Sequence, residues 1–242
     1  MTTINDKDYT EYSFTDKPKR LAFLTYLVKL LEIHERPSEY DCDVDELFLR
    51  MTVKDSPTKK MVTKWISFAL EKKKVKMLYL GLKTIYHNHY YLHGIAFCAT
   101  TLVYLTISDC EITNCLFELP ALKLLFLFVV CIEDDDFKDL IAGCPRIQKL
   151  RTQKLHNIVV SNHELKFFGV NLDCSDGKIL IESANLESLE FISFSMDFCE
   201  VEITFTTTVR ELTLRKAYGQ ETLMNFIDKF PLLEKLIIDD CR

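Results

Sequence analysis

The sequence predicts an α/β fold, namely a curved solenoid of about eight irregular leucine-rich repeats with a parallel sheet on its concave face. Strings of the form Leu-x-x-Leu-x-Leu recur along the chain, and successive strings start 18 to 27 residues apart. Of the 242 residues, 48% are hydrophobic. Leucine-rich repeats have periods of roughly 20 to 29 residues, and a single repeat cannot enclose its apolar side chains without stacked neighbours. The strings therefore indicate repeats that share one core.

Each string predicts one short strand that points its apolar side chains inward. In the fourth string Thr152 occupies an apolar position, so the sequence allows a break or a bulge there. The eight sets of inward positions are Val75/Leu78/Leu80, Leu102/Leu105/Ile107, Leu122/Leu125/Leu127, Ile147/Leu150/Thr152, Leu165/Phe168/Val170, Leu186/Leu189/Phe191, Val209/Leu212/Leu214 and Leu233/Leu236/Ile238.

The connections between the strings predict short helices or extra strands on the convex face. Residues 134–142, before Gly143 and Pro145, carry apolar residues at helical spacing, and residues 221–230 repeat this design. Between these two helices, three segments are typical of strands and each leads into the next repeat. They are residues 159–161, 179–181 and 201–205.

The first part of the chain predicts a different organisation, with a disordered tail over residues 1–15 and an N-terminal capping region over residues 16–74 that precedes the solenoid at 75–242. In the cap, one helix is expected to start at Asp16, a strand to cover residues 47–53, and a second helix to start at Ser56 and Pro57. That helix ends in Lys72 to Lys74, which indicate a solvated helix end or, alternatively, an anion-binding patch.

The cysteines are odd in number and contain no Cys-x-x-Cys pair, which indicates a reducing compartment, the cytoplasm or nucleus. Apolar neighbours predict that they pack as small buried hydrophobes. Cys110 and Cys241 take the position that leucine-rich repeats fill with Asn or Cys after the strand. The nine cysteines are Cys42, Cys98, Cys110, Cys115, Cys131, Cys144, Cys174, Cys199 and Cys241.

Charge and hydropathy exclude two classes of partner. With 30 basic and 36 acidic side chains the net charge is -6, so the chain has no large positive field for nucleic acid. The longest apolar run, residues 124–132, is too short to cross a membrane. Residues 1–100 carry 16 basic and 13 acidic side chains, against 14 and 23 in residues 101–242. The acidic second part favours a basic partner, and Glu190 and Glu211 lie on its predicted concave strands.

No motif predicts an enzyme, a cofactor or a metal. The sequence contains no Gly-x-Ser-x-Gly string and no phosphate-binding loop. His87, His89 and His93 could supply three zinc ligands, but their spacing is better explained by an exposed insert. The acidic run from Glu133 to Asp136 could hold a divalent cation, although a solvated helix start is the favoured interpretation. We therefore expect a non-catalytic protein.

The concave face is the predicted partner-binding surface. Strand alternation turns the third, fifth and seventh residues of each string to this face, so the third repeat exposes an apolar trio. Aromatic and arginine side chains are typical of interaction hot spots. Two alternatives remain, since a loop could cover this face or the register could shift by one residue and bury the phenylalanines. The candidate residues are Tyr104, Leu124, Phe126, Phe128, Lys149, Arg151 and Phe167.

Several segments of the sequence, taken in order, resemble plant F-box proteins with leucine-rich repeats. Residues 97–105 (FCATTLVYL) and 142–150 (AGCPRIQKL) carry the resemblance most strongly. Residues 65–80, 186–191 and 230–236 also fit, so the similarity covers about residues 20 to 242.

The resemblance implies a substrate receptor of a cullin-based ubiquitin ligase, whose repeats hold the target while an F-box docks on a Skp-type adaptor. Residues 1–19 contain neither the Leu-Pro opening nor the Leu-Ser-x-x-Trp-like close of an F-box, and the chain's Leu-Pro, Leu119-Pro120, lies within the repeats. The expectation is therefore target binding without adaptor docking. The alternatives are a small-molecule or hormone sensor, and an interaction protein without a ubiquitin-ligase role.

Overall fold

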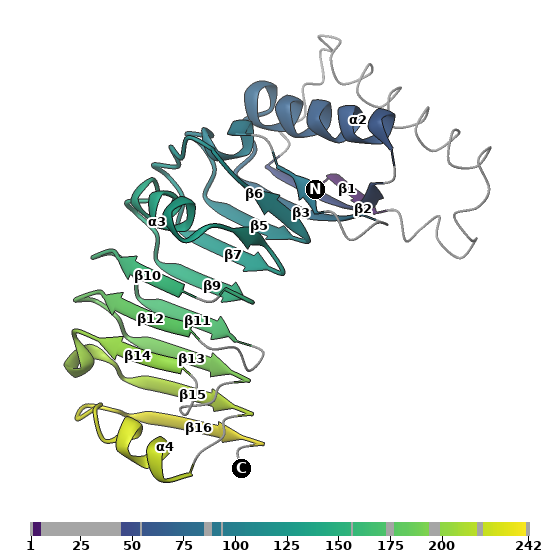
Figure 1. The fold of residues 1–242 in the computed structure, drawn as a ribbon. Helices are drawn as coiled ribbons and strands as arrows, with labels where there is room; N and C mark the ends of the chain where they lie inside the picture. The colour runs from purple at the N-terminus through teal and green to yellow at the C-terminus, as the bar shows by residue number, and fades with distance from the viewer. Residues whose placement is uncertain are drawn as a thin grey trace.

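The computed structural model describes residues 2–5, 45–53, 55–84, 89–92, 94–155, 157–172, 177–193, 199–216 and 220–240. These residues form a curved solenoid, which Figure 1 shows from the side. Its main sheet has ten strands, and every adjacent pair in it is parallel. The strands, in sheet order, are β1 (Thr2–Asn5), β2 (Glu46–Val53), β3 (Met77–Thr84), β5 (Tyr104–Ser108), β7 (Leu124–Phe128), β9 (Lys149–Gln153), β11 (Phe167–Asn171), β13 (Ser188–Ile192), β15 (Glu211–Arg215) and β16 (Lys235–Asp239).

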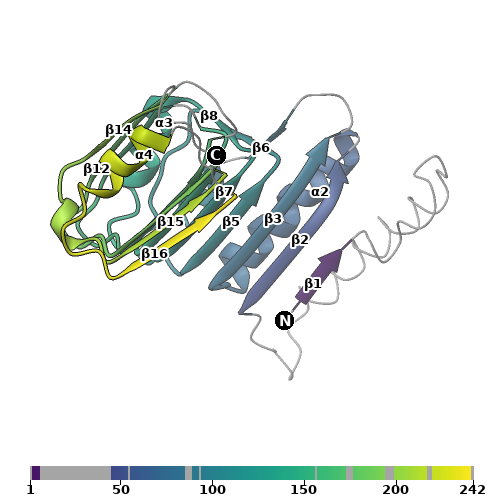
Figure 2. The ribbon, with the colours of Figure 1, turned by 90° about the horizontal axis from the view of Figure 1, so that it is seen from below.

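Each of the eight predicted strings contains one strand of this sheet, from β3 to β16, in the expected register. Leu125 and Leu127 are fully buried, while Phe126 between them is partly exposed. This alternation follows from the two-residue period of a strand. Figure 2 shows the sheet along one side of the coil, with the convex elements on the other and the core between them.

The fourth repeat is regular although Thr152 takes an apolar position. Strand β9 pairs with β11 over all five of its residues, so the bulge that the sequence allowed does not occur in β9. Thr152 is completely buried, and its hydroxyl has no hydrogen-bond partner among the described residues. The threonine fits because its shape is close to that of valine, at the cost of an unsatisfied polar atom.

Thr152→Val is therefore expected to raise the free energy of unfolding by about 1 kcal/mol, because it removes a buried polar group without changing the side-chain volume. Thr58→Val is the matched control. The hydroxyl of the equally buried Thr58 does have a partner, the carboxylate of Asp55, so this change is expected to destabilise the chain. Chemical denaturation measures both, and a loss of stability in Thr152→Val would contradict the assignment.

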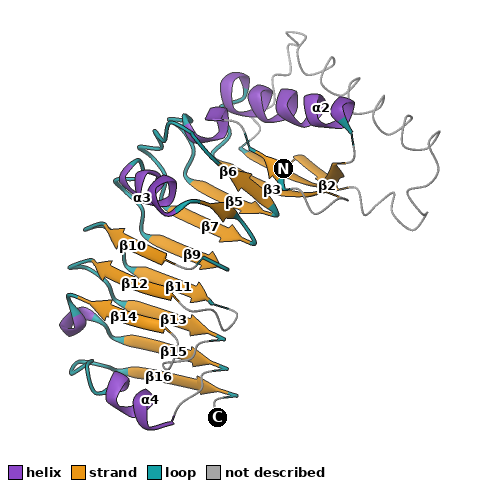
Figure 3. Ribbon diagram, viewed as in Figure 1, coloured by secondary structure: helices purple, strands orange, loops and turns teal. Residues whose placement is uncertain are grey.

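The convex layer consists of short helices and two small sheets, as Figure 3 shows. Helices α3 (Asp134–Ala142) and α4 (Gln220–Ile227) lie where the sequence predicts helices. Strands β10 (Asn157–Ser161), β12 (Gly177–Glu182) and β14 (Cys199–Ile203) form the predicted strands between them. A second small sheet was not predicted, because its strands are only two or three residues long. It contains β4 (Tyr90–Tyr91), β6 (Cys110–Ile112) and β8 (Cys131–Ile132).

Helix α3 packs on the sheet through Phe137, Leu140 and Ile141, which are buried. Its first turn carries three aspartates, whose charges the helix dipole favours. The helix ends at Gly143, where a Cβ atom would lie 2.3 Å from the carbonyl oxygen of Phe117. Only glycine allows this close approach, so the Gly-x-Pro stop also has a packing role.

The N-terminal region departs from the predicted boundaries. Helix α2 (Ser56–Ser67) is present, with the Asp55 carboxylate accepting a hydrogen bond of 2.9 Å from the Thr58 N–H, and a π-helical turn over Phe68–Lys72 continues it. Strand β2 pairs with β3 over eight residues, so the main sheet begins before the expected boundary at residue 75. The segment around Asp16, a predicted helix, lies outside the described residues.

The tail predicted as disordered contains strand β1, which pairs in parallel with residues 47–50 of β2. The prediction was wrong for residues 2–5, because their short polar sequence gives no periodic signal while the edge of β2 offers a pairing partner. Residues 6–15 of that tail lie outside the described residues.

Of the cysteines in the described residues, three are buried, two are exposed and Cys115 is partly exposed. Cys110, Cys144 and Cys199 are buried, and burial raises the pKa of the Cys144 thiol to about 12 and that of Cys199 to about 11, so both stay protonated. Cys98 and Cys131 are exposed, which corrects the expectation that all pack as buried hydrophobes. Cys131 comes one residue later in its repeat than Cys110 does, which accounts for the difference. Cys42, Cys174 and Cys241 lie outside the described residues.

Within the described part of the chain, no helix combines the length and apolar composition that crossing a bilayer requires.

Candidate functional site

The concave face of the main sheet presents one side chain from every second residue, aligned across strands by the parallel register. Its central line contains Phe48 of β2, Tyr79 of β3, Phe126 of β7, Arg151 of β9 and Glu190 of β13. Aromatic side chains therefore occupy its first half and charged ones its middle. Because neighbouring strands lie about 4.8 Å apart, side chains on this line touch across strands.

Five aromatic side chains form a continuous chain of ring contacts over β2, β3, β5 and β7, which we call the aromatic row. Ring centroids are 5.4 Å apart for Phe48 and Tyr79, 4.7 Å for Tyr79 and Tyr104, and 5.5 Å for Tyr104 and Phe126. Phe126 and Phe128 follow at 6.3 Å. All five are only partly exposed. Tilted and edge-on contacts at these distances are favourable, so the rings hold one another in place on the surface.

Tyr79 of the aromatic row keeps its proton. Burial, and secondarily the neighbouring Tyr104, raises the pKa of Tyr79 to about 12. Its hydroxyl is therefore neutral over the physiological range and can donate or accept a hydrogen bond. The row thus combines apolar ring area with a polar tip, as is typical of protein-binding surfaces.

A second group, the Arg151 cluster, adjoins the aromatic row and contains Arg151, Phe167 and Glu190. The Arg151 guanidinium carbon lies 5.8 Å from the Phe167 ring centroid, and the guanidinium forms an ion pair with the Glu190 carboxylate. Gly169 lies between the strands that carry this pair, and a Cβ there would meet the Phe167 ring at 3.1 Å and Arg151 Nε at 3.2 Å. Because Gly169 has no side chain, the Phe167 ring and the Arg151 side chain can both lie over this position of β11.

Glu190 corrects one sequence-based expectation. It was expected to attract a basic partner, but it is only 6% exposed and its charge is neutralised by Arg151. Burial, and then Arg215, lowers the pKa of Arg151 from its usual value, although an arginine still remains charged. Sequence cannot show this pairing, because the two residues are 39 positions apart and lie on strands separated by β11.

Other acidic residues of the second half are also paired across repeats. Glu187 lies 3.2 Å from Lys166, Glu234 lies 3.0 Å from Arg210, and Glu211 lies 3.5 Å from Lys235, each between side-chain nitrogen and oxygen. These pairs are exposed and each contributes little to stability. These ion pairs weaken the negative electrostatic potential that the net charge of residues 101–242 predicts.

The structure brings all seven sequence-predicted residues together on four neighbouring strands of the concave face. Lys149 is exposed, and the other six are partly exposed. The register alternative, in which the phenylalanines are core, does not hold because Leu125 and Leu127 fill the core instead. The seven are Tyr104 on β5, Leu124, Phe126 and Phe128 on β7, Lys149 and Arg151 on β9, and Phe167 on β11.

Two members of the aromatic row, Phe48 and Tyr79, are not among the seven sequence-predicted residues. Phe48 starts the row on strand β2, a segment that the sequence predicts as part of the N-terminal cap. The alternation of buried Leu47 and Leu49 around it is the signal that could have found it.

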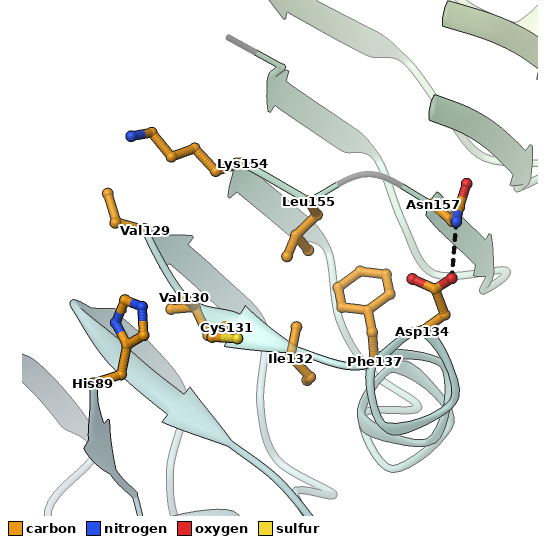
Figure 4. Close-up of a pocket in the computed structure, with 10 residues that line it drawn as sticks. All are labelled: His89, Val129, Val130, Cys131, Ile132, Asp134, Phe137, Lys154, Leu155 and Asn157. Atoms are coloured by element: carbon orange, nitrogen blue, oxygen red, sulfur yellow. Dashed lines mark hydrogen bonds between the residues drawn. The ribbon is translucent and has the colours of Figure 1, made fainter. Parts of the chain in front are cut away.

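A pocket of about 360 Å³ lies on the convex side, between strand β8, helix α3 and strand β10 (Figure 4). Phe137 and Leu155 point into it, and at one end the amide of Asn157 donates a hydrogen bond of 2.9 Å to the Asp134 carboxylate. The pocket forms where the convex layer changes from one small sheet to the other. Its lining is mainly apolar and lies apart from the concave strands.

The three histidines, for which an exposed insert is the favoured interpretation, cannot be compared in the structure, since His87 and His93 lie outside the described residues. His89 lines the rim of the convex pocket near Cys131. No group of three potential metal ligands occurs within the described ranges. The acidic run at Glu133 to Asp136 forms the start of helix α3.

Comparisons with known proteins give two matches. The sequence family described as "FBD-associated F-box protein At5g56370, LRR repeats" matches residues 62–212, more than half of the chain. FBD-associated F-box protein At4g13985 from Arabidopsis thaliana is 27% identical over 143 residues, which are 58% of this chain and 28% of the relative. The chain thus matches less than a third of that relative's length. No solved structure matches the chain.

Proposed function

Because the chain belongs to the family of leucine-rich repeats of FBD-associated F-box proteins, we propose that it is a non-catalytic module that binds a protein partner with its concave face. The aromatic row is the observation that carries the proposal. It places five rings, fixed by mutual contacts, on a partly exposed surface beside an arginine. Rigid aromatic anchors with an adjacent arginine are the residue types that dominate protein–protein affinity.

The concave face suits a protein segment better than a small acidic ligand. The guanidinium of Arg151, the central cation of the face, is already engaged by Glu190. An acidic ligand would have to compete with a buried carboxylate, whereas a protein segment can lie across the aromatic row without breaking this pair. The aromatic row also runs across four parallel strands, β2, β3, β5 and β7. Its length suits a partner segment in an extended conformation.

The finer proposal is that the bound protein is a target for ubiquitination. The resemblance to F-box proteins supports it, and the relative from Arabidopsis thaliana is itself an F-box protein by name. Target binding is proposed for this chain, and adaptor docking is not part of the proposal. Fused to an F-box, the chain is expected to increase the ubiquitination of its partner. The six cysteines that the structure describes are free, which is consistent with action in the cytoplasm or nucleus.

Phe126→Asp tests the proposal. The side chain is partly exposed, so the variant is expected to fold but to lose partner binding by about thirtyfold or more, as for a central hot spot. The measurement is quantitative capture of proteins from a cell extract by immobilised chain, with circular dichroism as the check of folding.

Phe205→Asp is the matched control, because Phe205 is an exposed phenylalanine after β14 on the convex side. The proposal is supported if some proteins are captured by the wild-type chain and by Phe205→Asp but not by Phe126→Asp. If both variants retain the same partners, the concave face is not the binding surface.

A further inference from the structure

Four exposed cations flank the aromatic row, on the concave face and along its edge. They are Arg50 of β2, Lys83 of β3, Lys123 directly before β7, and Lys149 of β9. The first two lie at the β2 end of the row and the last two at its β7 end. None of the four forms an ion pair with another residue in the described ranges. Both ends of the row are therefore positively charged.

In later repeats, a cation directly before a strand is paired with an acid of the next repeat. These pairs are Lys166 with Glu187 at 3.2 Å and Arg210 with Glu234 at 3.0 Å. Lys123 occupies the same place before β7, but its neighbours there are uncharged. Its N–H donates to the Val103 carbonyl at 2.9 Å, and its carbonyl accepts from the Gln148 N–H at 2.8 Å. The pairing of charges between repeats therefore does not extend to the aromatic row.

The register of the main sheet gives the other cations uncharged neighbours as well. Lys149 lies beside Leu124 of β7 and Phe167 of β11. At the opposite end of the row, Arg50 lies beside Gly81 of β3. An acidic side chain at any of these positions would form a favourable cross-strand pair. Since the sheet supplies none, the cations remain available to the carboxylates of a partner.

Carboxylates are scarce on the strands that carry the row. The outward positions of β2, β3, β5 and β7, all of them described, contain one carboxylate, that of Glu46 at the start of β2. Glu46 is partly exposed and lies four residues from Arg50 along the strand, about 13 Å away. The net charge of -6 thus arises elsewhere in the chain, and the local potential over the row is positive.

We propose that the protein segment bound on the aromatic row is acidic, with carboxylates on both sides of an apolar stretch. The inference rests on the proposed function, because it names the chemistry of the partner of that same surface. Strands β2 and β9 are four strand spacings apart, or about 19 Å. An extended chain covers this distance in about six residues. The two acidic groups are therefore expected about six residues apart, with apolar side chains between them that contact the rings.

The first experiment selects binders from a display library of random peptides on the immobilised intact chain and, in parallel, on Phe126→Ala, which keeps the charge unchanged. Peptides that need the Phe126 ring are expected to carry Asp or Glu toward both ends. If such peptides are neutral or basic, the proposed function stands and the acidic partner is overturned. If no peptide depends on this ring, the proposed function fails, and the inference fails with it.

The second experiment measures the affinity of a selected acidic peptide by fluorescence anisotropy. Arg50→Glu and Lys149→Glu are each expected to weaken binding by about fivefold or more, and added salt is expected to weaken binding to the wild-type chain.

Lys59→Glu is the matched control, because it makes the same change of net charge on helix α2, on the other side of the sheet (Figure 2). A peptide with lysines in place of the acidic residues at one end is expected to regain affinity for Lys149→Glu. Losses in Arg50→Glu and Lys149→Glu that are no larger than the loss in Lys59→Glu would overturn the proposal.

Discussion

Phe168→Ala is expected to lower the free energy of unfolding by about 3 to 5 kcal/mol, the usual cost of removing a fully buried phenylalanine. Phe168 is the central inward residue of β11 and is 0% exposed. The cavity would lie between the sheet and the convex layer, where neighbouring repeats contact it from both sides. Since each repeat of a solenoid depends on its neighbours, the loss affects the stacking on both sides of β11.

Phe126→Ala is the comparison for this effect. It also removes a phenylalanine side chain, but from strand β7 and from the concave face of the sheet. Its ring is partly exposed and contacts Tyr104 and Phe128, so a loss of about 1 kcal/mol is expected. Denaturant titration of both variants gives the two free energies. Equal losses would mean that the two faces are equally buried, which contradicts the register described for the sheet.

Arg151→Met is expected to lower the free energy of unfolding by about 3 kcal/mol, because it leaves the carboxylate of Glu190 buried without its partner. The double variant Arg151→Met/Glu190→Leu removes both charges and is expected to recover most of the loss. The argument depends on the burial of Glu190, whose side chain is 7% exposed while that of Arg151 is 37% exposed.

Arg210→Met is the control for the ion pair in the Arg151 cluster. Arg210 and Glu234 also form an ion pair across repeats, at 3.0 Å, but both side chains are exposed. Its loss is expected to cost less than 1 kcal/mol. If Arg151→Met costs no more than Arg210→Met, the Glu190 carboxylate is solvated and the cluster does not fix the concave face.

The main sheet could be predicted from sequence because its signal repeats. Each inward Leu-x-x-Leu-x-Leu string is a local pattern, and the eight of them confirm one another through their spacing. The same logic placed helix α3, whose apolar residues have helical spacing before Gly143. Strand β6, in contrast, is only three residues long, so no period can be detected in it.

The candidate surface could be predicted in position but not in detail. Alternation along β7 places Phe126 and Phe128 on the concave face whatever their neighbours are. The ring contacts of Phe48 and the ion pair of Glu190 depend on residues that come together only through the stacking of repeats.

Photo-crosslinking from a photo-reactive phenylalanine analogue at position 126 shows whether the concave face binds a protein. Position 205 on the convex side provides the control. If the partner lies on the concave face, a covalent adduct between the chain and its partner is expected from position 126 and none from position 205. An adduct from position 205 alone, or equal adducts from both, would contradict it.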